Sequence, residues 1–222
     1  MPGAGRRRTP VVLEVGNKRA FACALDWPGW CRAGKDEESA LEALAAYVPR
    51  YSAVPAEAGM RFPSHAGDSF EVVERVPGSS TTDFGAPGSV AHADREPFTP
   101  AEAERQTALV AAAWAVFDRV VEEAPPELRK GPRGGGRDRD AIVDHVLGAE
   151  VAYARKLGVR GRQPPAGDRE AVAAHRAAII DALRQSEQGD TGKGWPLRYA
   201  SRRFAWHALD HAWEIEDRRR PG

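Results

Sequence analysis

The residues best suited to chemistry are two histidines near the C-terminus, His207 and His211, which lie four positions apart. In a helix, side chains at positions i and i+4 stand one above the other on adjacent turns, so both imidazoles would project from one face. Imidazole is the commonest protein ligand for metals, and two rings on one rigid helix form a chelating pair. The spacing therefore indicates a metal site, with packing or surface histidines as the alternative.

The pair does not form the motif of a zinc protease. In that motif, His-Glu-x-x-His, a glutamate follows the first histidine and acts as general base, whereas this chain has Ala208 there. A catalytic base would have to be another residue, and Asp210 and Glu214 on the same helix are the candidates. Glu214 also has the spacing for an ion pair with Arg218.

Two arginines precede the histidine pair by about one helical turn. Arg202 and Arg203 are candidates for binding an acidic substrate, because a guanidinium is always charged and donates several hydrogen bonds. The alternative is that both are solvated.

Four segments of residues 99–219 have the apolar spacing of amphipathic helices. Thr99 and Glu102 form a capping box before the first, and Asp168 is the N-cap candidate of the third. Four such helices favour an antiparallel four-helix bundle. The predicted segments are residues 99–124, 140–157, 168–189 and 195–218.

The second of these segments carries His145 on its apolar face. Such a histidine is usually a core residue, but bundles build metal sites from side chains on facing helices. His145 with His207 and His211 would give three nitrogen ligands. A site of that kind leaves a coordination position for water or substrate, as catalytic metal sites require.

The N-terminal part of the chain has the pattern of a small sheet. Strand-like segments and one helical segment follow one another in the order β-β-β-α-β. Cys23 and Cys31 lie in this part with no metal-binding spacing, so we expect reduced thiols. The predicted strands are residues 11–15, 20–25, 31–34 and 69–76, and the helix is residues 36–48.

The sequence as a whole therefore predicts an α+β protein of two domains. We expect a basic tail over residues 1–10, the sheet domain over residues 11–76, an irregular linker over residues 77–98 and the helical bundle over residues 99–219. The glycine-rich basic segment at residues 130–139 is either a solvated loop or a cover for a pocket.

Composition narrows the classes of partner. The 222 residues contain 32 basic and 32 acidic side chains, so no net charge attracts nucleic acid or a membrane surface. No apolar run is long enough to cross a membrane, and no signal peptide follows the first basic residues. These features predict a cytoplasmic protein without a nucleic-acid or membrane partner.

Two stretches of the helical part resemble one known family. Residues 205–218, Ala-Trp-His-Ala-Leu-Asp-His-Ala-Trp-Glu-Ile-Glu-Asp-Arg, and residues 144–150, Asp-His-Val-Leu-Gly-Ala-Glu, resemble the DinB-like proteins, the superfamily of YfiT and mycothiol-dependent maleylpyruvate isomerase. The likeness covers about residues 98–219. It implies a divalent metal, zinc, nickel, iron or manganese, held by His145, His207 and His211. Glu150 and Glu214 would then hydrogen-bond to the ligands, and dimerisation is common in the family.

The resemblance also implies an activity. Members of the superfamily include isomerases and transferases that use mycothiol, bacillithiol or glutathione, so we expect a thiol-dependent transferase or isomerase that acts on a small electrophile. Neither cysteine lies in the helical part, and the thiol would come from a small-molecule cofactor such as mycothiol. One alternative is a metal-dependent hydrolase. Another is a non-catalytic, metal-stabilised binding module that recruits a protein partner through the N-terminal domain.

The N-terminal part has a resemblance of its own. Residues 21–30, Phe-Ala-Cys-Ala-Leu-Asp-Trp-Pro-Gly-Trp, followed by Gly34 and an acidic helix start at residues 37–41, resemble the HicB-like antitoxin domain over about residues 11–50. This implies a fold related to RNase H or to double-stranded-RNA-binding domains. Nothing matches the DNA-binding tail of many HicB proteins. A structural or dimerising domain is the alternative to toxin neutralisation.

Overall fold

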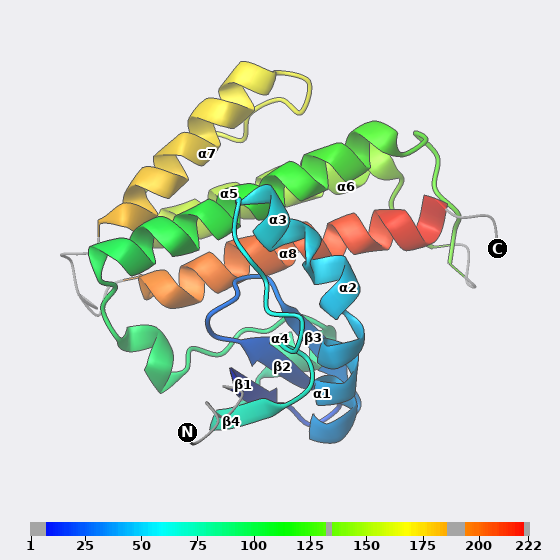
Figure 1. Ribbon diagram of the computed structural model, residues 1–222. Coiled ribbons are helices and arrows are strands. Elements are labelled where there is room, and N and C mark those ends of the chain that lie inside the picture. The colour runs from blue at the N-terminus through cyan, green and yellow to red at the C-terminus, as the bar shows by residue number, and fades with distance from the viewer. Residues whose placement is uncertain (1–7, 132–134, 186–193, 220–222) are drawn as a thin grey trace.

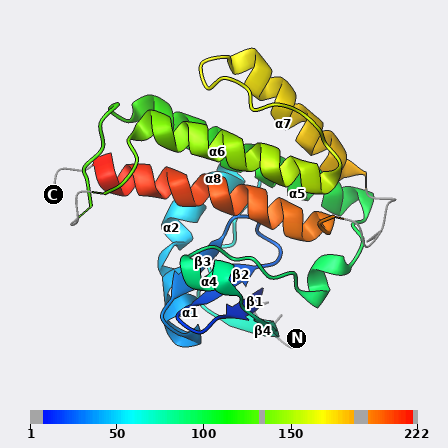
Figure 2. The same ribbon diagram turned by 180° about the vertical axis from the view of Figure 1, so that it is seen from behind.

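A long C-terminal helix, α8 (Leu197–Arg219), lies between a four-stranded sheet and the other long helices of the chain (Figures 1 and 2). The computed structural model describes residues 8–131, 135–185 and 194–219. The architecture is α+β, as the sequence predicts. Most of the predicted basic tail, three residues of the basic segment and the predicted end of the third helix at Gly189 lie outside the described residues.

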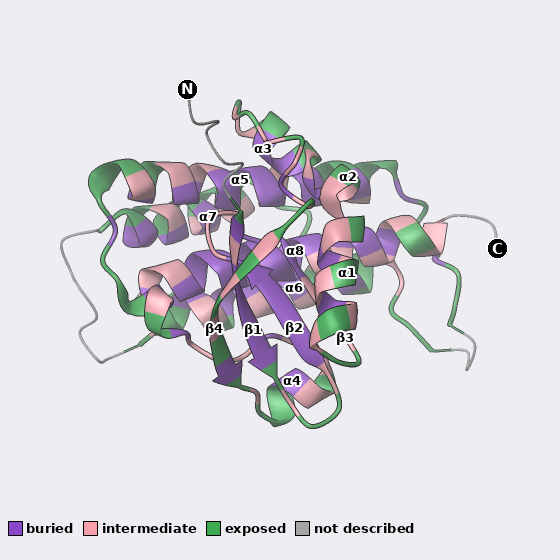
Figure 3. Cartoon of the chain, turned by 60° about the horizontal axis from the view of Figure 1, so that its bottom comes forward, coloured by how far each residue is buried: buried purple, intermediate pink, exposed green. Residues whose placement is uncertain are grey.

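The sheet contains β1 (Thr9–Val15), β2 (Ala20–Ala24), β3 (Cys31–Gly34) and β4 (Phe70–Pro77) in the order β3-β2-β1-β4. The first three strands are antiparallel neighbours, whereas β4 runs parallel to β1, so the sheet is mixed. Val11 stands opposite Ala24 on one side and Val72 on the other. Figure 3 shows that the inner strands β1 and β2 are mostly buried.

The connection from β3 to β4 is helical. It contains α1 (Glu37–Ala46), α2 (Val48–Tyr51) and α3 (Ala53–Glu57). Asp36 and Ser39 form a capping box at the start of α1, where acidic residues complement the helix dipole. The predicted β-β-β-α-β order is therefore confirmed, with α2 and α3 as additional helices. Pro49 cannot continue α1 but is tolerated in the first turn of α2.

The helices of the C-terminal part begin where the sequence signals predict. Thr99 and Glu102 cap α5 (Pro100–Glu123), and Asp168 caps α7 (Arg169–Arg184) by accepting a hydrogen bond from the Ala171 N–H. Between them, α6 (Arg139–Ala154) continues as a short 3₁₀ helix, η2 (Arg155–Leu157). Gly158 ends it with a positive φ of 79°, a conformation that glycine adopts without steric cost.

Residues 77–98, predicted as an irregular linker, contain α4 (Ser80–Phe84) and the 3₁₀ helix η1 (His92–Arg95). This segment is fastened by a buried carboxylate on β1. Glu14 accepts hydrogen bonds from the N–H groups of Gly88 and Ser89, at 2.9 and 3.0 Å, and from the Thr82 hydroxyl. Glu14 is more than sixty residues away from these partners in sequence. The pattern of residues 77–98 alone therefore could not reveal that this segment has a defined structure.

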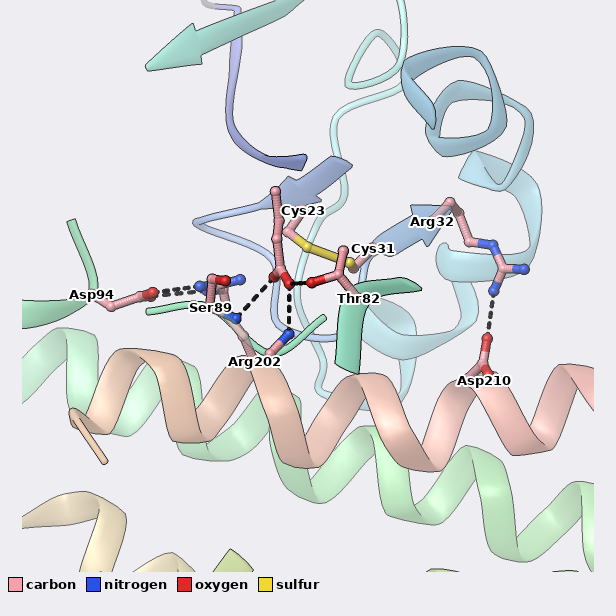
Figure 4. The surroundings of a disulfide bond; sticks show 10 residues. Cys23, Cys31, Arg32, Thr82, Ser89, Asp94, Arg202 and Asp210 are labelled. Carbon is pink, nitrogen blue, oxygen red and sulfur yellow. Dashed lines mark hydrogen bonds and ion pairs between the residues drawn. A yellow bond between two sulfur atoms is a disulfide. The ribbon is translucent and has the colours of Figure 1, made fainter. Parts of the chain in front are cut away.

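Cys23 and Cys31 form a disulfide, which corrects the prediction of reduced thiols. The two residues are directly opposite each other in the antiparallel pairing of β2 and β3, with Cα atoms 4.1 Å apart. Cross-strand neighbours of this kind are close enough to bridge. Figure 4 shows the bond between the sheet and α8. Phe21 and Trp206 pack with the two cysteines in one buried cluster.

The sheet and the helices share one apolar core. Its fully buried members come from both parts of the chain: Leu13, Trp30, Phe117, Phe204 and Leu209. The two units are therefore packed against each other and are not separated by solvent. Within the described ranges, no helix is both long and apolar enough to cross a membrane.

A buried ion pair joins η1 to α8. Asp94 is 1% exposed, and its Oδ1 accepts a hydrogen bond from Arg202 Nε at 3.0 Å (Figure 4). We expect Asp94→Asn to lower the free energy of unfolding by about 3–5 kcal/mol, because it leaves a buried guanidinium uncompensated. Urea unfolding at pH 7 measures this change.

The matched control is Glu37→Gln, which removes an exposed pair with Arg75 and should cost less than about 1 kcal/mol. An equal loss of unfolding free energy in the two variants would show that the buried ion pair stabilises the protein no more than the exposed one.

Candidate metal centre

Three histidines converge between α6 and α8. His145 comes from α6, and His207 and His211 come from α8. Their candidate ligand atoms all lie within 4.8 Å of one another, and the ring centroids are 4.7 to 5.1 Å apart. His207 is 8% exposed, and the other two are partly buried. The cluster takes in half of the six histidines; the others are His65, His92 and His175.

The local environment favours the neutral form of His145 and His207. Burial lowers the pKa of His207 well below its usual range, and the nearby charges of His211, Arg203, His145 and Arg137 lower it further. Burial also lowers the pKa of His145, with contributions from His211 and Arg137. Neutral rings at pH 7 have the free lone pair that a metal ligand needs.

Glu214 holds one of the rings in place. Its Oε2 lies 2.8 Å from Nδ1 of His211, and its Oε1 accepts a hydrogen bond from Arg218 at 2.7 Å. The hydrogen bond from His211 holds the pKa of Glu214 below its usual value. A carboxylate that accepts a hydrogen bond from Nδ1–H fixes the tautomer of the ring and leaves Nε2 free to bind a metal. This arrangement is typical of metal centres.

The donor set fits a divalent transition metal. Zinc binds histidine nitrogen at 2.0–2.1 Å, so the ligand atoms of a tetrahedral site lie about 3.4 Å apart. The three imidazole rings would have to move only slightly closer together to reach this distance. Imidazole ligands suit zinc, copper, iron and nickel. No histidine, cysteine, aspartate or glutamate of the described chain joins the group as a fourth member. A metal held here would keep at least one position for another ligand.

Three of the residues predicted for the site have other partners. Asp210 forms an ion pair with Arg32 of β3 at 2.9 Å, and Arg202 pairs with Asp94 (Figure 4). Glu150 is buried but pairs with Arg176 of α7 at 3.2 Å, and not with a histidine. Adjacent helical positions are about 100° apart, so residues beside a ligand in sequence face other elements. These side chains join secondary-structure elements to one another.

Arg203, by contrast, does lie at the site, together with two residues that sequence reasoning missed. The Tyr153 ring is 5.6 Å from the ring of His207, and the Arg203 guanidinium lies over that tyrosine at 5.2 Å. Tyr153 is eight positions after His145, a spacing of about two turns that could have placed it on the same face of α6. Arg137, from the basic segment, acts on His145 and His207 through its charge.

No protein-family model, curated protein or solved structure matches the chain. The geometry provides three imidazole nitrogen donors, one carboxylate that orients a donor, and two arginines whose charge reaches the histidines.

The lowered pKa values predict a pH-dependent stability of the metal-free protein. Below about pH 6.5 the unfolded histidines bind protons that the folded His145 and His207 resist, so unfolding is favoured as the pH falls. For His207, whose pKa lies well below its usual range, the loss approaches about 1.4 kcal/mol per pH unit as the pH falls below 6.5, and the contribution of His145 is smaller. Urea unfolding of the metal-free protein across this range measures it.

His207→Gln should flatten that dependence, whereas His92→Gln should leave it unchanged because His92 is exposed. A dependence that survives His207→Gln in full would show that His207 titrates alike in the folded and unfolded states.

The hydrogen bond to His211 gives a second prediction. Glu214→Gln should weaken zinc binding by about 10–100-fold, since loss of the partner that orients a ligating histidine typically has this effect. Competition with a chromophoric chelator measures the affinity. The control is Glu216→Gln, which removes a carboxylate of the same helix that pairs with Arg50 and should leave zinc affinity unchanged. Equal affinities in all three proteins would contradict the role of Glu214.

Proposed function

We propose that the helical part of the chain is a DinB-like four-helix bundle that holds a divalent metal between His145, His207 and His211. We further propose that this centre serves a thiol-dependent transferase or isomerase reaction on a small electrophile. The observation that carries the proposal is a cluster of three histidines, two of them with lowered pKa values, without a fourth protein ligand among the described residues. The resemblance of residues 144–150 and 205–218 to DinB-like motifs supports it.

A bound metal would supply a Lewis acid that lowers the pKa of a thiol and polarises an electrophile. The protein's own contribution is to hold three nitrogens, to orient His211 through Glu214 and to surround the site with positive charge from Arg203 and Arg137. Positive charge favours an anionic nucleophile such as a thiolate. Cys23 and Cys31 are joined in a disulfide, so the thiol would be a separate molecule.

The carboxylates favour a thiol over water as the nucleophile. Asp210 is paired with Arg32 and Glu214 with His211, so both candidate general bases are engaged elsewhere. Without a base, the nucleophile must lose its proton through electrostatic effects alone. A thiol, with a pKa of about 8.5, requires a far smaller shift than water, with a pKa of about 15.7. Hydrolysis therefore ranks second.

The non-catalytic binding module is the remaining alternative. A metal that only stabilises the fold would be enclosed by four protein ligands. The described residues provide three at this site, which favours the enzyme. In the module hypothesis the HicB-like sheet unit would bind a protein partner.

Metal content is the first test. Tag-free protein loaded with zinc, nickel, iron or manganese should retain close to one ion per chain, as measured by mass spectrometry. His145→Ala and His207→Ala should lose it while circular dichroism shows a retained fold, and His92→Ala should bind as wild type. Absence of bound metal in the wild-type protein after reconstitution would refute the proposal.

Measurements of turnover then distinguish thiol transfer from hydrolysis. Screening small electrophiles with added mycothiol, bacillithiol or glutathione should reveal thiol-dependent conversion that is lost in His211→Ala. Turnover that is independent of added thiol would instead establish hydrolysis.

A further inference from the structure

We propose that a polar cavity at the junction of the sheet unit and the helical part binds an adenine nucleotide, with the base at Gln106 and Trp27 and the phosphate at Arg105. The residues described around this cavity include none of the three clustered histidines. Arg198, which lines the cavity, precedes His207 by about 14 Å along α8. The inference therefore goes beyond the proposed function and does not depend on a metal.

The cavity has a volume of about 420 Å³, which is within the usual range of ligand pockets. Its lining comes from β1, from the turn between β2 and β3, from the segment that leads into β4, and from α5 and α8. Aromatic rings and polar groups are combined in its walls, as sites for planar polar ligands require. The lining includes Arg8, Asp26, Trp27, His65, Arg105 and Gln106.

The first observation is an amide without a partner. Gln106 of α5 is only 5% exposed and lines the cavity, yet no hydrogen bond joins its side chain to another described residue. A buried amide without a hydrogen bond is destabilising, so a ligand that satisfies it is favoured. A carboxamide presents a donor and an acceptor side by side, which matches the N7 acceptor and the N6 donor of adenine. A trans peptide group points its N–H and C=O to opposite sides and could satisfy only one of the two.

The second observation is a planar wall held in place by its neighbours. The Arg105 guanidinium lies 4.4 Å from the centroid of the Trp27 ring, and its Nη1 donates a hydrogen bond to the Asp26 carbonyl oxygen. The Trp27 ring also meets the Phe62 ring edge-on at 4.9 Å. Nucleobases stack on aromatic rings and on guanidinium planes. A base that pairs with Gln106 would therefore have a flat apolar surface beside it.

The third observation is positive charge without a matching carboxylate. Arg8 and Arg105 form no ion pair with a described acidic residue, whereas Arg198 pairs with Glu102 at 2.9 Å. The hydrogen bond from Arg198 lowers the pKa of Glu102 to about 2, so that pair stays ionised. A phosphate accepts two parallel hydrogen bonds from one guanidinium. The Asp26 carboxylate also lines the cavity, and a carboxylate can accept hydrogen bonds from ribose hydroxyls.

The test titrates AMP, adenosine and ribose 5-phosphate into metal-free full-length protein by calorimetry at pH 7.5. AMP should bind at least tenfold more tightly than either of the others, because each of them lacks one of the two recognised groups. Gln106→Leu should weaken AMP binding about tenfold, the usual effect of losing a bidentate contact to a base, and leave ribose 5-phosphate binding unchanged. Arg105→Met should abolish the preference for AMP over adenosine.

Two substitutions outside the cavity are the matched controls. Gln163→Leu removes an amide that already donates to Asp144, and Arg119→Met removes an arginine of α5 that is paired with Glu57. Both variants should bind AMP as the wild type does.

No AMP binding to the wild type, equal affinity for the three compounds, or AMP affinity that survives both cavity substitutions would overturn the inference. Should Gln106→Leu fold poorly, Gln106→Glu provides the second variant, since it keeps the size of the side chain but loses the donor and should bind AMP more weakly. The outcome is separate from that of the proposed function, because AMP binding is measured without metal.

Discussion

The rest of the structure depends on the burial of α8. The sheet unit covers one side of this helix and the other long helices cover the opposite side, so residues 201–209 are all buried (Figures 1 and 3). Yet this stretch contains Ser201, Arg202, Arg203 and His207. A buried polar group without a hydrogen bond is destabilising, so each of these side chains requires a hydrogen-bond partner or a ligand.

Most of the polar groups of α8 find such partners. Ser201 donates to the Leu197 carbonyl, Arg202 pairs with Asp94, and Asp210 pairs with Arg32. The two ion pairs fix the rotation of α8 against η1 and β3. On α8, Arg203 Nη1 and Arg218 Nη2 lack a hydrogen-bond partner among the described residues. Arg203 lies beside Tyr153 and His207, on the side of α8 that carries the histidine cluster.

The sequence predicts the parts of this arrangement that depend on local chemistry. Capping boxes mark the starts of α1 and α5, and the i, i+4 spacing places His207 and His211 on one face. Contacts between residues far apart in the sequence leave no such local pattern. Whether Arg202 or Arg203 lies at the site depends on which one meets Asp94, and Asp94 lies in a segment without periodicity. The disulfide likewise depends on the register of β2 and β3, which sets Cys31 opposite Cys23.

The sheet unit is best understood as part of the support of this site. Trp206, which covers the Arg203 guanidinium, is itself held by Phe21, at a centroid distance of 6.1 Å, and by the disulfide of the sheet. Removing the sheet unit would expose this tryptophan and leave Asp210 without Arg32, its partner on β3. A helix as polar as α8 could not remain buried under those conditions. The two units therefore depend on each other for stability, and the position of Arg203 beside the histidines depends on both.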